Sequence, residues 1–220
     1  MVEADDVEPA MRSSVIAGYR RRVLELDHAI WCVPGAATHA VPRALDGFAI
    51  EPGRVHAAQG TRNVRVMFAR SYLEVLWIER PELVAQRGLD FGDRCARPAR
   101  RAPFGCVLRG RISVAERARF RPYELPDAPG MVLQILDDAD RDAPFVAVFE
   151  TDDVEAGWPV RRAAPEHLAH AHGAREIVRA TFTCPAAAPI AGVRDVRFTI
   201  GAPRLELELD RGRLVIDGDA

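Results

Sequence analysis

The chain has 220 residues and a mass of 24.3 kDa, which allows one large domain or two small ones around a buried core. Its 30 basic and 32 acidic residues give a formal net charge of -2 without a long run of one sign, so a general nucleic-acid binder is not expected. All 30 basic residues are Arg, a side chain that suits bidentate binding of carboxylate or phosphate.

The four cysteines are far apart and form no Cys-x-x-Cys pair, so they indicate reduced thiols and neither a zinc knuckle nor a redox motif. The acidic, polar start of the chain does not resemble a signal peptide, and no apolar run approaches the length of a membrane span. The sequence therefore predicts a soluble cytoplasmic protein.

Residues 1–22 show no clear period and are expected to form an N-terminal extension. The next stretch, residues 23–79, reads as a strand, a short helix and three more strands, and we expect it to form one compact unit. His28 on its first strand and Glu74 on its last strand both share a face with apolar residues. Two ionisable side chains are thus predicted where a sheet normally carries apolar ones.

A carboxylate inside an apolar pattern is costly unless an arginine, a hydrogen-bond network or a metal ion compensates it. One interpretation is that Glu74 pairs with Arg65 and that His28 is a core histidine bonded to the backbone. The other is a shared site, because His28 and Glu74 lie at corresponding depth on the first and last strands of one sheet. Turn residues place His56 beside a loop and Asn63 at the start of the next strand.

Three motifs in this unit form a recognisable set: Asp-His near the start of the first strand, the turn His-x-x-x-Gly-Thr-x-Asn, and Tyr-Leu-Glu on the fourth strand. With them, the unit resembles the first module of the glyoxalase-like proteins of the vicinal oxygen chelate superfamily. The resemblance implies an α+β fold of paired βαβββ modules, whose curled mixed sheets form a cleft, here with extra strands inserted between the modules. It implies that His28 and Glu74 are metal ligands, that Glu74 is also the catalytic carboxylate, and that His56 and Asn63 bind substrate at the cleft mouth.

Residues 80–175 are expected to form an insertion or connection, because an Arg-rich segment with several prolines precedes further strand-like stretches and loops. The alternating acids of residues 137–142 lack the glycine of a calcium loop, so a solvated hairpin tip is predicted. His167, His170 and His172 are predicted to lie in an exposed loop. The alternative is that this loop folds over the cleft and supplies one histidine to substrate or metal.

Residues 176–220 are expected to form a shortened second module, in which Arg179 corresponds to His28 and Glu206 to Glu74. By this analogy Glu206 is a further metal ligand and Arg179 binds an anionic group of the substrate. An arginine in place of a second histidine departs from the family's ligand set. Its positive charge would also weaken the binding of a divalent metal ion by repulsion. A plain sheet with one wet face is the alternative for this segment.

Three functions remain open at this point. The first is a divalent-metal-dependent lyase, isomerase or dioxygenase acting on a small oxygenated organic substrate, with Zn, Ni, Mn or Fe as the metal and no nucleotide cofactor. The second is a non-catalytic protein of the same fold that sequesters an organic anion through Arg65 or Arg179. The third is a structural module whose pocket is filled by side chains. Neither a nucleic acid nor a membrane is expected as a partner, and the resemblance allows a homodimer.

Overall fold

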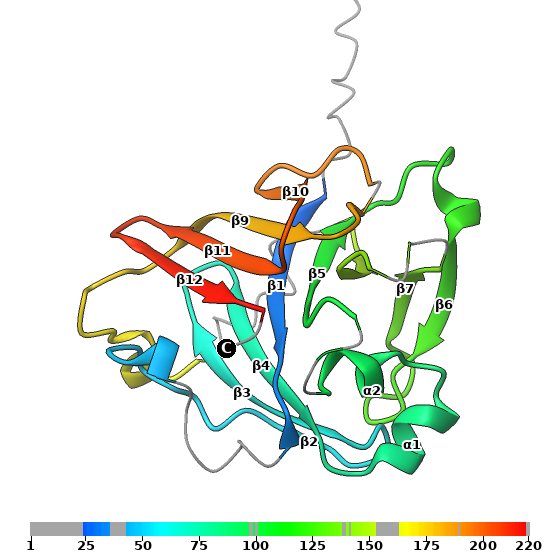
Figure 1. Cartoon of the computed structure of the whole chain (residues 1–220), viewed down its shortest axis with the longest axis horizontal. Helices are drawn as coiled ribbons and strands as arrows, with labels where there is room; N and C mark the ends of the chain where they lie inside the picture. Colours follow the sequence, from blue (N-terminus) through cyan, green and yellow to red (C-terminus); the bar gives the residue numbers. More distant parts are fainter. Residues whose placement is uncertain are drawn as a thin grey trace, which may run out of the picture.

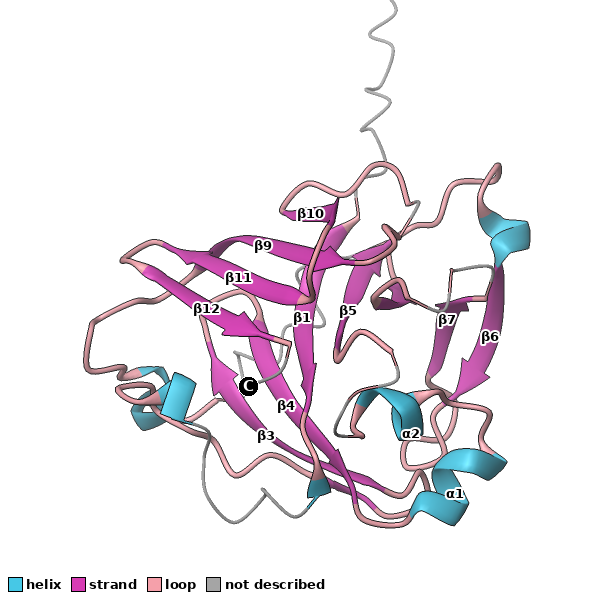
Figure 2. Ribbon diagram, in the orientation of Figure 1, coloured by secondary structure: helices cyan, strands magenta, loops and turns pink. Residues whose placement is uncertain are grey.

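The protein is described here by a computed structural model, which covers residues 24–35, 43–96, 99, 101–137, 140, 142–152, 163–188 and 190–218. The expected N-terminal extension and the greater part of the expected helix after the first strand lie outside the described residues. Strands dominate the fold, and Figure 2 shows that the helices are few and short. No helix in the described ranges has the length and apolar character needed to cross a membrane.

Eight strands form one curled mixed sheet, a half-barrel that makes up the body of the molecule (Figure 1). In spatial order the strands are β2 (Val55–His56), β3 (Thr61–Met67), β4 (Tyr72–Ile78), β1 (Glu25–Cys32), β5 (Phe104–Gly110), β8 (Phe145–Glu150), β7 (Val132–Leu136) and β6 (Phe120–Glu124). The expected curled mixed sheet is therefore confirmed, although the fold is mostly β. Between the first two strands of each half, the described residues contain only short 3-10 helices, η2 (Arg43–Leu45) and η3 (Arg117–Arg119).

The pairing pattern of the first four strands recurs in the next four. β1 lies parallel to β4, which is followed by β3 and β2 in antiparallel pairing, and β5 lies parallel to β8, which is followed by β7 and β6. The two halves join where β1 and β5 pair antiparallel. The second half thus lies within residues 80–175, which the sequence assigned to an insertion. β5 lies between β1 and β8, and every one of its residues is buried, as a central strand requires.

Residues 176–220 contribute strands to a separate four-stranded sheet. Its order is β10 (Val196–Ile200), β9 (Ile177–Cys184), β11 (Arg204–Leu209) and β12 (Arg213–Asp217). This small sheet lies across the large one (Figure 1). Its pairing differs from the shortened module expected from the sequence, because similar strand endings carry no information about which strands pair.

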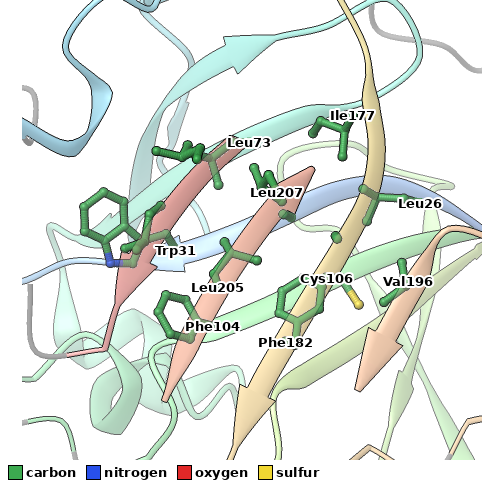
Figure 3. Packing of buried hydrophobic residues seen from close by; sticks show 14 of the residues in the cluster. Leu26, Trp31, Leu73, Phe104, Cys106, Ile177, Phe182, Val196, Leu205 and Leu207 are labelled. Atoms are coloured by element: carbon green, nitrogen blue, oxygen red, sulfur yellow. The ribbon is translucent and has the colours of Figure 1, made fainter. Parts of the chain in front are cut away.

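The small sheet packs its apolar face onto the large sheet. Phe182, Leu205 and Leu207 alternate with polar residues along their strands and are fully buried against Leu26 and Phe104 (Figure 3). This alternation is the pattern of a sheet with one covered face. We call the face of the large sheet that meets the small one the covered face, and the opposite one the site face.

A second apolar cluster occupies one end of the site face. The segment between the two halves forms the helices α1 (Pro81–Gln86) and α2 (Phe91–Arg94), and its residues Val84 and Phe91 pack against Ile30 and Leu76 of the sheet. Because side chains alternate along a strand, residue 28 on β1 and residue 74 on β4 project from this same face. The packing of the helices therefore leaves His28 and Glu74 beyond the filled end.

Candidate functional site

The centre of the candidate site is the carboxylate of Glu74, whose side chain is only 8% exposed. His28 Nε2 lies 3.3 Å from Glu74 Oε2, and the side-chain amide of Asn63 donates a hydrogen bond to Oε1. His56 Nε2 lies 3.9 Å from the same Oε1 and 3.3 Å from Asn63 Nδ2. Strands β1, β2 and β3 thus each bring one polar side chain to a buried carboxylate on β4.

A β-bulge gives His28 its orientation. The register of β1 against β5 shifts between Leu26 and His28, so that Asp27 is the extra residue. A bulge re-aims side chains that would otherwise point to opposite faces. The His28 Nδ1-H group donates to Asp27 Oδ1 at 2.7 Å, which leaves Nε2 directed at Glu74. A carboxylate on one ring nitrogen is a common way of fixing the tautomer and orientation of a functional histidine.

Asp27 is in turn held by Arg109 of β5. Arg109 is 2% exposed, and its Nη1 lies 3.3 Å from Asp27 Oδ2 while its Nη2 donates to the carbonyl of Arg70 at 3.2 Å. Burial lowers the pKa of Arg109 to about 10, against the opposing effect of the Asp27 and Glu25 carboxylates. The guanidinium is still protonated at neutral pH, so one row of alternating charges runs from Arg109 through Asp27 and His28 to Glu74.

The charges in this row shift the pKa values of His28 and Glu74. Burial by itself would lower the pKa of His28, but hydrogen bonds and charges from Asp27 and Glu74 outweigh it and raise this pKa to about 9. Burial would raise the pKa of Glu74, but His28, Asn63 and His56 together hold it below its usual value. At neutral pH the pair is therefore an imidazolium and a carboxylate.

The ring of Tyr72 borders His28 and is itself contacted by an arginine. The rings of His28 and Tyr72 stack with centroids 4.3 Å apart, and Arg65 Cζ lies 5.6 Å from the centre of the Tyr72 ring. Arg65 forms an ion pair with Glu51 through its Nε atom. Burial, followed by the charges of Asp27 and Glu74, raises the pKa of Tyr72 well above its ordinary value. Tyr72 is therefore a neutral phenol beside the carboxylate.

Asn63 is fixed by the backbone of the preceding turn. Its Oδ1 accepts a hydrogen bond from the Arg54 backbone N-H at 2.7 Å, so its amide nitrogen is the end that faces Glu74 and His56. Gly53 has a φ of 67°, and a Cβ at this position would lie 2.3 Å from the Asn63 carbonyl oxygen. A glycine at position 53 is thus required for the close approach of this turn to β3.

The structure does not bring the two predicted residues of the small sheet to this site. Glu206 lies between the buried residues Leu205 and Leu207, so it projects from the outer face of the small sheet. Arg179 pairs with Glu208 on that sheet, with Nη1 and Oε2 2.9 Å apart. Both sheets separate these residues from Glu74, because they and Glu74 project from opposite sides of the shared core.

The loop that contains the three neighbouring histidines does not reach Glu74. His170 is buried, accepts a hydrogen bond from the Ala49 N-H at 3.0 Å and contacts the Met67 carbonyl at 2.9 Å through Nε2. Its ring also lies edge-on to Phe48, as does that of His172. These two histidines therefore tie the loop to the end of β3 by hydrogen bonds and ring contacts.

A cavity of about 330 Å³ lies in the second half of the large sheet, lined by Asp90, Arg94, Arg101, Arg121, Asp137 and others. Its arginines are engaged within the protein: Arg94 and Arg101 both bond to Asp90, and Arg121 pairs with Asp137 at 2.9 Å. None of its lining residues belongs to the Glu74 cluster. The cavity is consequently a separate feature.

The donor chemistry around Glu74 suits a divalent metal ion, because imidazole nitrogen and carboxylate oxygen are ligands of zinc, nickel, iron and manganese. The 3.3 Å between His28 Nε2 and Glu74 Oε2 is close to the roughly 3.4 Å between two ligands of one tetrahedral ion with bonds of about 2.1 Å. In the described part of the chain, however, no group of three or more His, Cys, Asp or Glu side chains is arranged to hold an ion. His28 and Glu74 are therefore the two side chains that would hold an ion here, and metal binding stays a prediction.

Sequence reasoning missed two of the residues that organise the site. Asp27 was noticed only as part of the Asp-His motif, and a bulge cannot be seen in one sequence. Arg109 had a detectable signal, since it is the one charged residue within the otherwise apolar strand Phe104–Gly110.

Comparison with known proteins gives one family match. The model of a family described as a glyoxalase-like domain matches residues 26–194, which include both halves of the large sheet and the Glu74 cluster. A search of curated proteins finds no match. Among solved structures, a crystal structure of a hypothetical protein from Staphylococcus aureus is similar with a TM-score of 0.48 and 12% sequence identity, covering 82% of this chain and 88% of that chain.

Proposed function

The chain belongs to the glyoxalase-like domain family, and on this premise we propose that it is an enzyme that moves a proton on a small oxygenated organic substrate at Glu74. Lyase and isomerase reactions fall within this proposal, whereas a dioxygenase reaction would in addition need molecular oxygen and a redox-active metal such as Fe or Mn. The catalytic carboxylate is Glu74, and the side chain of His28 contacts it. His56 and Asn63 border the space in which a substrate oxygen would lie.

One observation carries the proposal: a nearly buried carboxylate is contacted by two imidazoles and an amide from three different strands. A structural carboxylate needs a single good partner, and Arg65 stands directly opposite Glu74 in the β3–β4 register. Arg65 pairs with Glu51 instead, and Glu74 faces His28 and His56. Titratable groups with pKa values shifted by one another are typical of functional sites.

The chain's own residues suit proton transfer. Glu74, whose pKa is held low, is ionised at neutral pH and is able to accept a proton from a carbon next to a carbonyl. Protonated His28, held by Asp27, has its Nε2 3.3 Å from Glu74 and would donate its proton to the negative charge that develops on an enolate oxygen. The neutral hydroxyl of Tyr72 is a further donor beside the pair. Asn63 orients the carboxylate through its amide.

A divalent ion, when bound by His28 and Glu74, would polarise the substrate carbonyl and replace the proton on His28. Zn, Ni, Mn and Fe remain the candidates, because the donor set does not select among them. Asp27 would then act on the ion through the ring of His28, by keeping Nε2 free of its proton.

The test is the metal content of protein purified without chelator or affinity metal, compared with the His28→Ala, Glu74→Ala and Glu206→Ala variants. About one divalent ion per chain, lost in the first two variants and retained in Glu206→Ala, is the expected result. Glu206→Ala is the matched control, because Glu206 is also a carboxylate on a strand but lies on the outer face of the small sheet. Equal metal content in all four proteins, or none after incubation with each metal, would contradict the metal part of the proposal.

The alternative is a metal-free protein of the same fold that binds an organic anion. The observation that favours it is that the Glu74 carboxylate is already bonded to His28 and Asn63. Thermal-shift screening of small carboxylic acids against the wild type and Arg65→Met distinguishes the two. Stabilisation that is lost in Arg65→Met, in a protein that takes up no metal, supports the binding protein.

A further inference from the structure

The turn that follows His56 is held by the second half of the large sheet. The backbone N-H groups of Ala58 and Gln59 donate to the two carboxylate oxygens of Asp127 at 2.9 and 3.1 Å. Asp127 lies in the loop between β6 and β7, far from His56 in the sequence. Successive backbone N-H groups that point at one carboxylate form a concave anion site, here filled by the protein itself.

Three further hydrogen bonds secure the same turn. The Tyr123 hydroxyl of β6 donates to Gln59 Oε1 at 3.3 Å, and the Gln59 amide donates to Thr61 Oγ1 at 3.0 Å. Arg87, which follows α1, donates from Nε to the Ala58 carbonyl at 3.3 Å. Gln59 and Tyr123 are both buried, so their hydrogen bond is shielded from water.

These contacts join the two edges of the half-barrel. β2 and β6 are the first and last strands in the eight-stranded order, so no backbone ladder connects them. The turn after β2 and the loop after β6 meet instead through the side chains of Asp127 and Tyr123. The curled sheet is thus closed at this end by side-chain contacts.

The position of His56 benefits from this closure, because its own strand is a short edge strand. β2 has two residues, which pair only with Arg62 and Thr61 of β3, and its other residue, Val55, is 53% exposed. Short edge strands without packing on both sides open readily. The contacts from the second half therefore add to the local restraints on His56, whose own carbonyl accepts hydrogen bonds from the Gln59 and Gly60 N-H groups.

We propose that Asp127, supported by Tyr123, is a positioning residue that keeps the His56 imidazole within reach of Glu74 and Asn63. In this arrangement the second half of the sheet acts on the site by holding the turn of the first half. The expected change in metal binding rests on the function proposed above, whereas the expected change in the position of the His56 ring does not.

The experiment compares the wild type with Asp127→Ala, Asp127→Asn and the control Asp137→Ala by NMR. Asp137 is also an acidic residue next to β7, but it pairs with Arg121 and does not contact the His56 turn. In the wild type, nuclear Overhauser effects are expected between the His56 ring protons and the Asn63 side-chain amide, whose nitrogens are 3.3 Å apart. Asp127→Ala should abolish them and shift the His56 ring signals while leaving the His28 signals in place. Asp127→Asn, which keeps one acceptor oxygen, should restore them in part.

Zinc binding by calorimetry is the second readout, and it separates this inference from the proposed function. Asp127→Ala should lower the affinity for zinc by about tenfold, as changes in residues that support the metal ligands commonly do. Asp137→Ala should leave the affinity unchanged. If the wild type binds no zinc, the metal part of the proposed function fails, and the NMR comparison still decides the role of Asp127. Unchanged His56 signals and contacts in folded Asp127→Ala would overturn the inference. Should that variant not fold, Tyr123→Phe removes only the hydroxyl bonded to Gln59 and should displace His56 in the same direction.

Discussion

Asp27 and His28 are consecutive residues of one strand, yet their side chains meet, with Asp27 Oδ1 2.7 Å from His28 Nδ1. In a regular strand they would project from opposite faces. The bulge between Leu26 and His28 turns both toward the site face, where His28 then reaches Glu74. The backbone irregularity is therefore what couples the two carboxylates through one imidazole.

Asp27→Asn should lower the pKa of His28 from about 9 toward its ordinary value. The amide keeps a hydrogen-bond acceptor but removes one of the two negative charges that stabilise the imidazolium. The measurement is a titration of the His28 ring signals by NMR in a metal-free buffer with chelator. Asp46→Asn, at an acidic residue outside this charge row, is the control and should leave the titration in place. A His28 pKa that stays near 9 in Asp27→Asn would show that Glu74 alone sets it.

The free energy of unfolding should depend on pH through His28. A histidine whose pKa is about 9 in the folded state and about 6.5 in the unfolded state contributes fully below pH 6.5, and this contribution is lost as pH rises through 9. The shift corresponds to about 3 kcal/mol at most. Glu74 belongs to the same ion pair, and its pKa is lowered in the folded state. The stability that it contributes is therefore lost as pH falls through its folded-state pKa.

Urea unfolding of metal-free protein between pH 6 and 10 measures this dependence. The wild type should lose stability across the upper part of the range, and His28→Gln should show a flatter curve. His172→Gln is the control, since His172 contacts Phe48 and lies outside the charge row. Parallel curves for the wild type and His28→Gln would contradict the raised pKa.

Arg109→Met should destabilise the protein by about 3 kcal/mol, because it removes one of the two cations that contact the partly buried Asp27 carboxylate and leaves only His28. Arg179→Met is the matched control. It also breaks an arginine–carboxylate pair, but the pair is exposed and should be worth less than about 1 kcal/mol. Denaturant midpoints of the two variants give the comparison. Similar losses in both would mean that burial of Arg109 adds nothing to the pair.

The sequence was sufficient to place four residues of the site near one another. Alternation in residues 23–79 put His28 and Glu74 each on an apolar face of its strand, turn chemistry put His56 beside a loop and Asn63 at the start of a strand, and the family resemblance implied one cleft for all four. The structure brings these four side chains together, and the predicted family is confirmed. Their roles in metal binding and catalysis stay predictions.

Long-range pairing is the part that the sequence did not contain. Periodicity shows which residues of a strand face the same way, but not which strand lies beside it. The stretch around Glu206 alternates as well as the stretch around Glu74, yet one lies in the small sheet and the other in the large sheet. The β1–β5 pair that joins the halves, and the bulge at Asp27 within it, exist only once the two distant strands meet.

Gly60→Ala should lower the free energy of unfolding by about 3 kcal/mol, because the backbone conformation disfavours a side chain and the added Cβ would clash with its neighbours. Gly60 has a φ of 86°, and a Cβ there would lie 2.5 Å from the Arg80 carbonyl oxygen. Gly88 also has a positive φ, 66°, but nothing lies within 4 Å of its added Cβ, so Gly88→Ala measures the backbone cost alone. Thermal unfolding should show the larger loss for Gly60→Ala. Equal losses would mean that the Arg80 backbone moves away at little cost.

Phe182→Ala tests whether the small sheet and the large sheet form one cooperative unit. Phe182 has no exposed surface and belongs to the core between the sheets, so its truncation should cost about 3 to 5 kcal/mol. Thr181, the residue before it, projects from the other face of β9, and Thr181→Ala should cost less than about 1 kcal/mol. Because a continuous apolar core joins the two sheets, urea unfolding followed by fluorescence and by circular dichroism should give one coincident transition, shifted as a whole in Phe182→Ala. Two separate transitions, with only one shifted by Phe182→Ala, would show instead that residues 176–220 unfold independently of the half-barrel that carries Glu74.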